Sequence, residues 1–284
     1  MSNAWRCSKS DSFLVASSSA SPNVSRQFGF GVAAGLDPAV AAPLAARCEE
    51  LGYASMWSND HPGASGLETL ATFAEGAQSI ELGVAVIALD RHGPAEINAK
   101  IEELGLDRER LLVGVGAGFS EKPLTTMRSA VRELREAIPG ARLILAAMGP
   151  RMCALAGSRF DGAFLNWMTP EFAAGAREQV HAGAREAGRE PPPIFGYVRT
   201  AVGDDAAERL AKEESFYRDL HDGYRNQFAR LDQPVGTVGV AAPDRETAQG
   251  ELARYTALDA VVVRGLASAS LEAMAGLAAA AAPA

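Results

Sequence analysis

Two apolar runs that end in glycine carry the residues best suited to hold a ligand. The first is Leu111–Gly116, followed by Ala117 and Gly118, and the second is Leu143–Met148, followed by Gly149-Pro150-Arg151. Short apolar runs bounded by Gly or Pro are typical of buried parallel strands. Glycine at the end of such a strand lets a ligand approach the backbone. We therefore expect a ligand to lie across the ends of both runs.

The second run also opens a helix, and this junction suits an anion. Pro150 takes the first helical position, where its missing N–H costs nothing. Free N–H groups and the positive end of the helix dipole favour a phosphate, and Arg151 could add a charge-assisted bond. The alternative is an ordinary helix start. We predict a phosphate site at Met148, Gly149, Pro150 and Arg151.

The pair Asp60-His61 is the strongest candidate for proton chemistry. Histidine titrates near neutrality, so His61 could exchange a proton with a substrate while a hydride moves. The alternative is a local hydrogen-bond network in which Asp60 caps the next turn. A metal site is not expected, because a catalytic zinc site typically needs three protein ligands and the other histidines are isolated. These other histidines are His92, His181 and His221, of which the last two are expected on helices at the surface.

Strand-like and helix-like segments alternate along the chain from Phe28. This alternation predicts a parallel sheet, and right-handed crossovers would close it into a (β/α)8 TIM barrel, here a single domain over residues 28–284. A doubly wound open sheet is the alternative. The eight expected strands are Phe28–Ala33, Ala54–Ser58, Ile80–Ile87, Leu111–Gly116, Leu143–Met148, Gly162–Trp167, Ile194–Val202 and Ala260–Arg264.

The segments between the strands have clear helix signals. Asp37 and Thr169 precede prolines at helix starts. Residues 205–231 are expected to form one long helix, and the charged run 208–230 is expected to be its solvated face. Trp57 and Trp167 are predicted to be core aromatics that could border the site.

In such a barrel the chemistry lies at the carboxyl ends of the strands. This rule selects a few places, several of them charged. They are Asn59-Asp60-His61, Ala88 to His92, Ala117 to Lys122, Met148 to Arg151, Asn166-Trp167, Arg199 and Arg264.

Composition narrows the classes of partner. The chain has 284 residues and a formal net charge of −8, which disfavours nucleic acid or an anionic membrane as a general partner. Three dispersed cysteines and no secretory segment favour a cytoplasmic location. No apolar stretch reaches membrane-spanning length. Residues 1–27 are expected to be an expression remnant (Met1-Ser-Asn-Ala4) and a disordered serine-rich leader.

From Phe28 onward the chain resembles the luciferase-like oxidoreductases, and in particular the branch that uses the deazaflavin coenzyme F420. This superfamily also contains FMN-dependent monooxygenases. The motifs that carry the resemblance are Leu51-Gly-Tyr-Ala-Ser-Met-Trp-Ser-Asn-Asp-His61, Ile80-Glu-Leu-Gly-Val-Ala-Val86, Leu112-Val-Gly-Val-Gly-Ala-Gly118 and Ala146-Ala-Met-Gly-Pro-Arg-Met-Cys-Ala-Leu-Ala-Gly157 with Asp161-Gly162.

The resemblance implies roles for individual residues. His61 would lie beside the reactive face of the cofactor ring as a proton donor or acceptor, with Asp60 beside it. Ala85-Val86 corresponds to a peptide, often cis, that bulges against the ring. Ala117 and Gly118 would lie along the cofactor tail, and residues 148–151 would bind its phosphate. Ala88 and Phe119 would border the substrate.

The chain departs from the family pattern in three ways. The excursion after the fourth strand is short, because residues 119–140 hold little more than one loop and one helix. Phe119 stands where a sugar-phosphate dehydrogenase branch has a glutamate, so that substrate is not expected. Met148 replaces a smaller residue and could crowd the phosphate site.

The resulting prediction is hydride transfer between coenzyme F420 and a small organic substrate. The alternatives are an FMN-dependent monooxygenase, which needs a water-excluding lid, and a non-catalytic barrel that only binds a flavin-like ligand. The spacing of Gly114, Gly116 and Gly118 is weak as a dinucleotide fingerprint and also fits close packing at the end of a strand. The sequence contains no nucleophile-elbow motif, which argues against a hydrolase. A homodimer is expected from the resemblance alone.

Overall fold

The computed structural model describes residues 26–283. The expected leader therefore lies almost wholly outside the described residues. Among those residues, no helix combines the length and apolar character needed to cross a bilayer.

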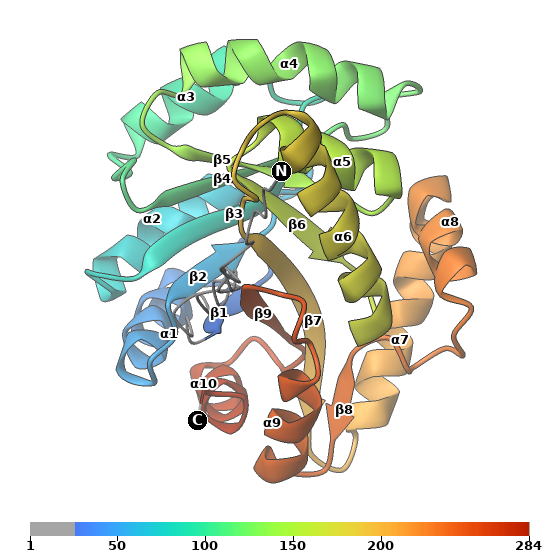
Figure 1. Cartoon of the computed structure of the whole chain (residues 1–284). Coiled ribbons are helices and arrows are strands. Elements are labelled where there is room, and N and C mark those ends of the chain that lie inside the picture. The colour runs from blue at the N-terminus through green and yellow to red at the C-terminus, as the bar shows by residue number, and fades with distance from the viewer. Residues whose placement is uncertain (1–25, 284) are drawn as a thin grey trace, which may run out of the picture.

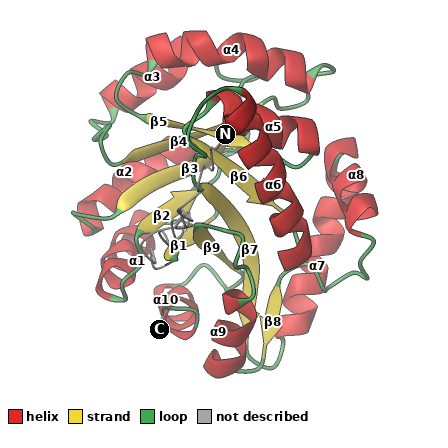
Figure 2. Cartoon of the chain, in the orientation of Figure 1, coloured by secondary structure: helices red, strands yellow, loops and turns green. Residues whose placement is uncertain are grey.

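Eight parallel strands form a closed barrel at the centre of the molecule, with helices around it (Figures 1 and 2). The strands pair in the order β6-β5-β4-β3-β2-β1-β9-β7, and the β6–β7 pairing closes the ring. This closure confirms the predicted (β/α)8 barrel and excludes the open doubly wound sheet. The barrel strands are β1 (Gln27–Val32), β2 (Ser55–Ser58), β3 (Glu81–Ala88), β4 (Leu111–Gly116), β5 (Arg142–Ala146), β6 (Gly162–Asn166), β7 (Ile194–Val202) and β9 (Ala260–Gly265).

The helices follow the strands in the expected alternation. The Asp37 carboxylate accepts the N–H of Ala39 at 2.9 Å, and the Thr169 hydroxyl accepts the N–H of Phe172 at 3.2 Å, as predicted for helix caps. The only helix between β4 and β5 is α4, so the predicted short excursion is confirmed. The helices outside the β7–β9 connection are α1 (Pro38–Glu50), α2 (Gly66–Gly76), α3 (Pro94–Glu103), α4 (Pro123–Ala137), α5 (Pro150–Arg159), α6 (Pro170–Glu186) and α10 (Leu271–Ala280).

Large aromatic side chains fill the interior of the barrel. Trp57 is fully buried and donates its indole N–H to the Ser55 hydroxyl at 2.7 Å, which confirms it as a core residue. Its ring fits because Gly83 has no side chain: a Cβ there would lie 2.2 Å from the indole. Gly31 leaves room for the Tyr197 ring in the same way, because a Cβ at Gly31 would lie 2.6 Å from that ring. Small residues on neighbouring strands thus make room for aromatic rings inside the barrel.

The connection from β7 to β9 is the part of the fold that the sequence analysis described least well. The expected single helix over 205–231 is two helices, α7 (Ala206–Leu220) and α8 (Asp222–Leu231), because His221 between them has extended backbone angles. The connection continues through β8 (Val240–Ala242), a strand that was not predicted, and α9 (Arg245–Ala253). β8 pairs with the end of β7 beyond the part that pairs with β6. We call residues 206–242 the cover; Figure 1 shows α7 and α8 beside α6.

A buried carboxylate holds the cover together. Glu214 on α7 is fully buried and accepts the N–H groups of Gly236 and Val238 at 2.9 and 3.1 Å. It also accepts two bonds from Arg218, the shorter at 2.6 Å. The expectation that the whole charged run is a solvated face is therefore wrong at Glu214. A carboxylate can replace several missing backbone partners at once, and such clamps are buried with their charge paired.

Candidate active site

The predicted site residues lie at the carboxyl ends of β2, β3, β4 and β5, on one end of the barrel. Two sides of this end differ in character. On the β2–β3 side the loops carry Asp60, His61 and Arg91, and on the β7–β9 side Arg199 and Arg264 lie beneath the cover.

The peptide bond between Ala85 and Val86 is cis, as the resemblance implied. It coincides with a register shift in the β3–β4 pairing between Val84 and Ile87. Gly114 lies opposite this irregularity: a Cβ there would lie 2.2 Å from the Val84 carbonyl oxygen. Gly114 therefore makes room for the β3 bulge, which is the packing role that the sequence analysis kept as an alternative.

His61 is exposed in a tight turn that fixes its tautomer. Its Nδ1 accepts the N–H of Gly63 at 3.1 Å, and its backbone pairs with Ala64. Because Nδ1 acts as an acceptor, the proton of the neutral ring belongs on Nε2. His61 therefore presents an N–H donor from the loop after β2.

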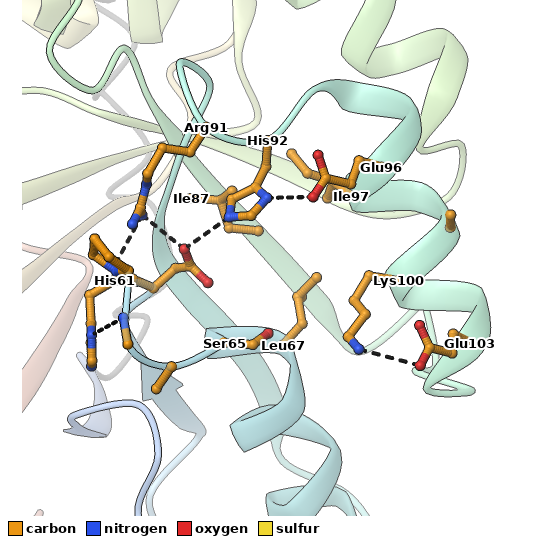
Figure 3. A pocket seen from close by; sticks show the side chains of 15 residues that line it. His61, Ser65, Leu67, Ile87, Arg91, His92, Glu96, Ile97, Lys100 and Glu103 are labelled. Atoms are coloured by element: carbon orange, nitrogen blue, oxygen red, sulfur yellow. Dashed lines mark hydrogen bonds and ion pairs between the residues drawn. The ribbon is translucent and has the colours of Figure 1, made fainter.

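Asp60 is committed to its neighbours. Its carboxylate accepts the N–H of Gly66 at the start of α2, at 3.1 Å, and forms an ion pair with Arg91 at 2.9 Å. His92 lies 3.6 Å from the same carboxylate and 2.7 Å from Glu96, so it is not the isolated residue that was expected (Figure 3). Only 7% of the Asp60 side chain is exposed. The geometry matches the alternative in which Asp60 caps the next turn; its contact with a cofactor stays a prediction.

A cleft of about 700 Å³ opens beside these residues, between the β2 and β3 loops and helix α3. Figure 3 shows His61 and Arg91 at one end and Lys100 and Glu103 at the other. Lys100 is paired with Glu68 at 2.8 Å and with Glu103 at 3.3 Å. The cleft thus has a charged wall in which each cation already has a carboxylate partner.

The start of α5 has the features expected of a phosphate site. Gly149 occupies the N-cap position without a side-chain cap, and a Cβ there would meet nothing within 4 Å. Arg151 is exposed on the first turn. Arg230 of the cover donates to the Met148 carbonyl at 3.3 Å, so a second guanidinium lies at this junction. Arg230 could not be predicted at this junction, because 82 residues separate it from Met148.

The loop after β4 packs against the loop after β3. Gly118 has a φ of 59°, and a Cβ there would lie 1.8 Å from the Asp90 carboxylate, which accepts the Phe119 N–H at 2.8 Å. Only glycine fits this left-handed position. The free face of Gly118 is therefore turned to Asp90, and Ala117 is buried; their contact with a cofactor tail stays a prediction.

Phe119 and His221 meet across the mouth. The Phe119 side chain is 74% exposed, and its ring centroid lies 5.4 Å from that of His221. His221 caps α8 by accepting the Gly223 N–H at Nδ1, at 2.9 Å. Burial and the nearby Arg225 lower the pKa of His221, and Asp222 opposes them. His221 therefore lies between two helices and beside Phe119, whereas it was expected on a helix at the surface.

Beneath the cover, Arg199 is 3% and Arg264 is 8% exposed. Arg199 donates to the Asn166 side-chain oxygen, and its guanidinium carbon lies 4.2 Å from the Trp167 ring centroid. Trp167 is buried and has a φ of 50°, a left-handed conformation that is rare outside glycine and is associated with functional sites. Its backbone carbonyl accepts a bond from Gln227 of α8 at 2.8 Å.

Within residues 26–283 the structure groups no three His, Cys, Asp or Glu side chains in a way that could hold a metal ion.

Comparisons with known proteins place this architecture in a family. A sequence model of the luciferase-like monooxygenases matches residues 23–139 and 123–280, and the chain belongs to that family. A curated relative, 5,10-methylenetetrahydromethanopterin reductase from Methanolobus tindarius, is 26% identical over 204 residues. That match covers 59% of this chain and 63% of the relative, which is less than two thirds of its length.

Two solved structures share the fold at lower identity. The coenzyme F420-dependent tetrahydromethanopterin reductase from Methanopyrus kandleri superimposes with a TM-score of 0.68 at 17% identity, covering 90% of this chain and 96% of that chain. The oxygenating constituent of 3,6-diketocamphane monooxygenase from Pseudomonas putida, in complex with FMN, gives 0.64 at 15% identity, covering 91% and 98%.

Proposed function

We propose that this protein is an oxidoreductase that transfers a hydride between coenzyme F420 and a small organic substrate. The observation that carries the proposal is the start of α5, where an uncapped helix end and two arginines, Arg151 and Arg230, lie at the same end of the barrel as His61. The F420-dependent activity attributed to the Methanopyrus kandleri reductase supports this choice of cofactor.

The residues at the mouth fit such a cofactor. The α5 N–H groups, with Arg151 and Arg230, would hold its phosphate. Gly116, Ala146 and Ala88 are small residues at the ends of β4, β5 and β3, where a flat ring would lie beside the Ala85-Val86 bulge. A 5-deazaflavin, when bound, supplies two-electron hydride chemistry, and the protein supplies binding and orientation.

His61 would then balance the proton. In the neutral ring the Gly63 N–H holds Nδ1 as an acceptor, so Nε2–H would donate a hydrogen bond to the substrate. To release that proton the ring would first take up a proton at Nδ1, which displaces the Gly63 contact. Ala88 and Phe119, with His221 above Phe119, would border the bound substrate. Because Asp60 is bound to Arg91 and α2, its contribution would be to fix the loop that carries His61.

An FMN-dependent monooxygenase is the second candidate. The cover that buries the β7–β9 side supplies part of the water exclusion that such chemistry needs, and that the short excursion after β4 does not supply. The FMN bound to the Pseudomonas putida structure supports this alternative.

Separate titrations with coenzyme F420 and FMN, followed by fluorescence and binding heat, distinguish the candidates. Binding of coenzyme F420 alone supports the proposal, and binding of FMN alone moves the protein to the monooxygenases. Binding of neither would contradict both oxidoreductase candidates. Size-exclusion chromatography of the same samples tests the homodimer expected from the resemblance.

With a substrate from a subsequent screen, we expect His61→Ala to lower kcat by about 100-fold or more, a typical loss for general acid–base catalysis. Cofactor affinity should change little. His181→Ala, on α6, is the matched control and should keep full activity. Unchanged turnover in His61→Ala would remove the residue from the chemistry.

A further inference from the structure

Arg199 and Arg264 form a pair that the strands themselves place. They are direct register partners on the neighbouring strands β7 and β9. Tyr197 and Val262, two residues earlier on each strand, are also partners and belong to the barrel interior. Because side chains alternate along a strand, both arginines also point into the barrel, one layer nearer the mouth.

The donors around this pair lack acceptors. Within the described part of the chain, no hydrogen-bond partner meets the buried Arg199 Nε, Tyr197 Oη or Trp167 Nε1. Arg264 has one long contact, to the Asn59 side-chain oxygen at 3.5 Å. The nearest carboxylate to Arg199 is that of Glu213 on α7, at 4.0 Å. Buried polar groups are almost always satisfied, so three buried groups without a partner, beside the weakly bonded Arg264, indicate a binding site for an anion.

Charge in this region points the same way. Two guanidinium groups are buried side by side, and one carboxylate stands at the limit of ion-pair distance. Burial and the neighbouring Arg199 lower the pKa of Arg264, while Tyr197 opposes them. An anion between the guanidiniums would supply the charge that the protein omits.

The walls of the site favour a small, flat anion. The Arg199 guanidinium lies 4.2 Å from the Trp167 ring centroid, 5.0 Å from Tyr217 and 5.6 Å from Tyr197. Rings on these sides hold the guanidinium plane and leave its edge for bonding. A carboxylate matches that edge, since its two oxygens lie in one plane and accept a fork of N–H donors.

This site is separate from the one proposed for the cofactor phosphate. That site lies at the end of β5, whereas β7 and β9 follow two and three positions further around the ring. Arg151 and Arg230 serve the α5 end, and Arg199 and Arg264 serve the barrel interior.

We propose that Arg199, Arg264 and Tyr197 bind the carboxylate group of the substrate, so that this protein acts on a small organic acid. That the bound acid is a substrate rests on the proposed function, whereas the binding of an anion at this site does not. Trp167 adds its indole N–H, and Asn166 holds Arg199 in place.

Calorimetry on the full chain, in a buffer free of carboxylate and phosphate, tests the site without cofactor. The probes are propionate and propionamide, which have nearly the same shape and differ in charge. We expect propionate to bind at least about tenfold more tightly than propionamide and to raise Tm, because the charge-assisted bonds are lost in the amide. Arg199→Gln and Arg264→Gln should each weaken propionate binding by at least about tenfold, whereas Arg264→Lys should lose less.

The matched control is Arg132→Gln, an exposed arginine on α4, which should leave propionate binding unchanged. Circular dichroism checks the fold of each variant. Equal binding of propionate and propionamide, no binding of either, or binding that survives both glutamine variants would overturn the proposal. Tighter binding of inorganic phosphate than of propionate would overturn the choice of a carboxylate.

The titrations with coenzyme F420 and FMN keep the two proposals apart. If coenzyme F420 binds and propionate does not, the acid site is wrong and the oxidoreductase proposal stands. If propionate binds through the arginines and neither cofactor binds, the acid site stands and the oxidoreductase proposal fails.

Discussion

At the ends of β2 and β3 the charged side chains pair with one another, whereas beneath the cover Arg199 and Arg264 are buried with no carboxylate in close contact. Asp60 satisfies Arg91 and the start of α2, and His92 bridges to Glu96. The first side is complete without a ligand, and the second gathers donors that lack acceptors. This difference supports a division of roles in which the β2–β3 side positions His61 and the β7–β9 side binds the carboxylate of the substrate.

The largest effect is expected where the cover is held. Glu214→Ala should lower the free energy of unfolding by about 3 kcal/mol, because two backbone N–H groups and Arg218 lose a buried partner. Amide exchange in α8 and β8 should accelerate more than in β3. Glu208→Ala, exposed on the same helix, is the control. A loss in Glu214→Ala as small as that in Glu208→Ala would show that Glu214 is solvated.

A smaller loss is expected on the β2–β3 side. Asp60→Ala should lower the free energy of unfolding by about 2 kcal/mol, because Arg91 stays partly buried without its partner and the Gly66 N–H loses its acceptor. Glu96→Ala, whose side chain is 62% exposed, should change it by less than about 0.5 kcal/mol. Urea denaturation measures both. If Asp60→Ala is neutral, the pairing on this side is not what holds its loops.

For Arg264 we expect the free energy of unfolding to change in the opposite direction. In anion-free buffer, Arg264→Gln should leave the free energy of unfolding unchanged or raise it by about 1 kcal/mol, because a buried cation without a partner opposes folding. Urea denaturation beside Arg132→Gln measures the change. A loss as large as that in Asp60→Ala would show that Arg264 is paired in solution and that the two sides do not differ.

The smallest effect concerns pH. Burial lowers the pKa of His221 below its ordinary value, so the folded cover favours the neutral ring. Its contribution to stability is fully present above the ordinary pKa of about 6.5. The contribution falls as the pH drops below that value, and no further loss follows below the folded pKa. An NMR titration should give a midpoint below 6.5, and Asp222→Asn should lower it further; a midpoint above 6.5 would contradict the burial.

Much of the barrel could be predicted because its strands are continuous apolar runs bounded by Gly or Pro. Two features could not. β8 has only three residues, Val240–Ala242, and its pairing depends on a long-range contact with β7. The local pattern around His221 is helical, so the sequence does not indicate a break there. The contact of His221 with Phe119 is tertiary and becomes visible only in the folded chain.

The site shows the same division. The positions of His61 and of residues 148–151 follow from the rule that chemistry lies at strand ends. The same rule selected Arg199 and Arg264, but their missing partners are visible only when the neighbouring strands are in place. The pairing of Asp60 with Arg91 joins two loops 31 residues apart, and no local pattern announces it.

The register of β7 with β9 has a consequence for engineering. Arg199 and Arg264 are carried by strands about 4.8 Å apart, so backbone hydrogen bonds and not loops set their separation. Loops after β2, β3 and β4 can therefore be exchanged or lengthened while this anchor stays at a fixed depth. Chain-length preference among acids would then be a property of the loops alone, adjustable without rebuilding the point at which every substrate is held.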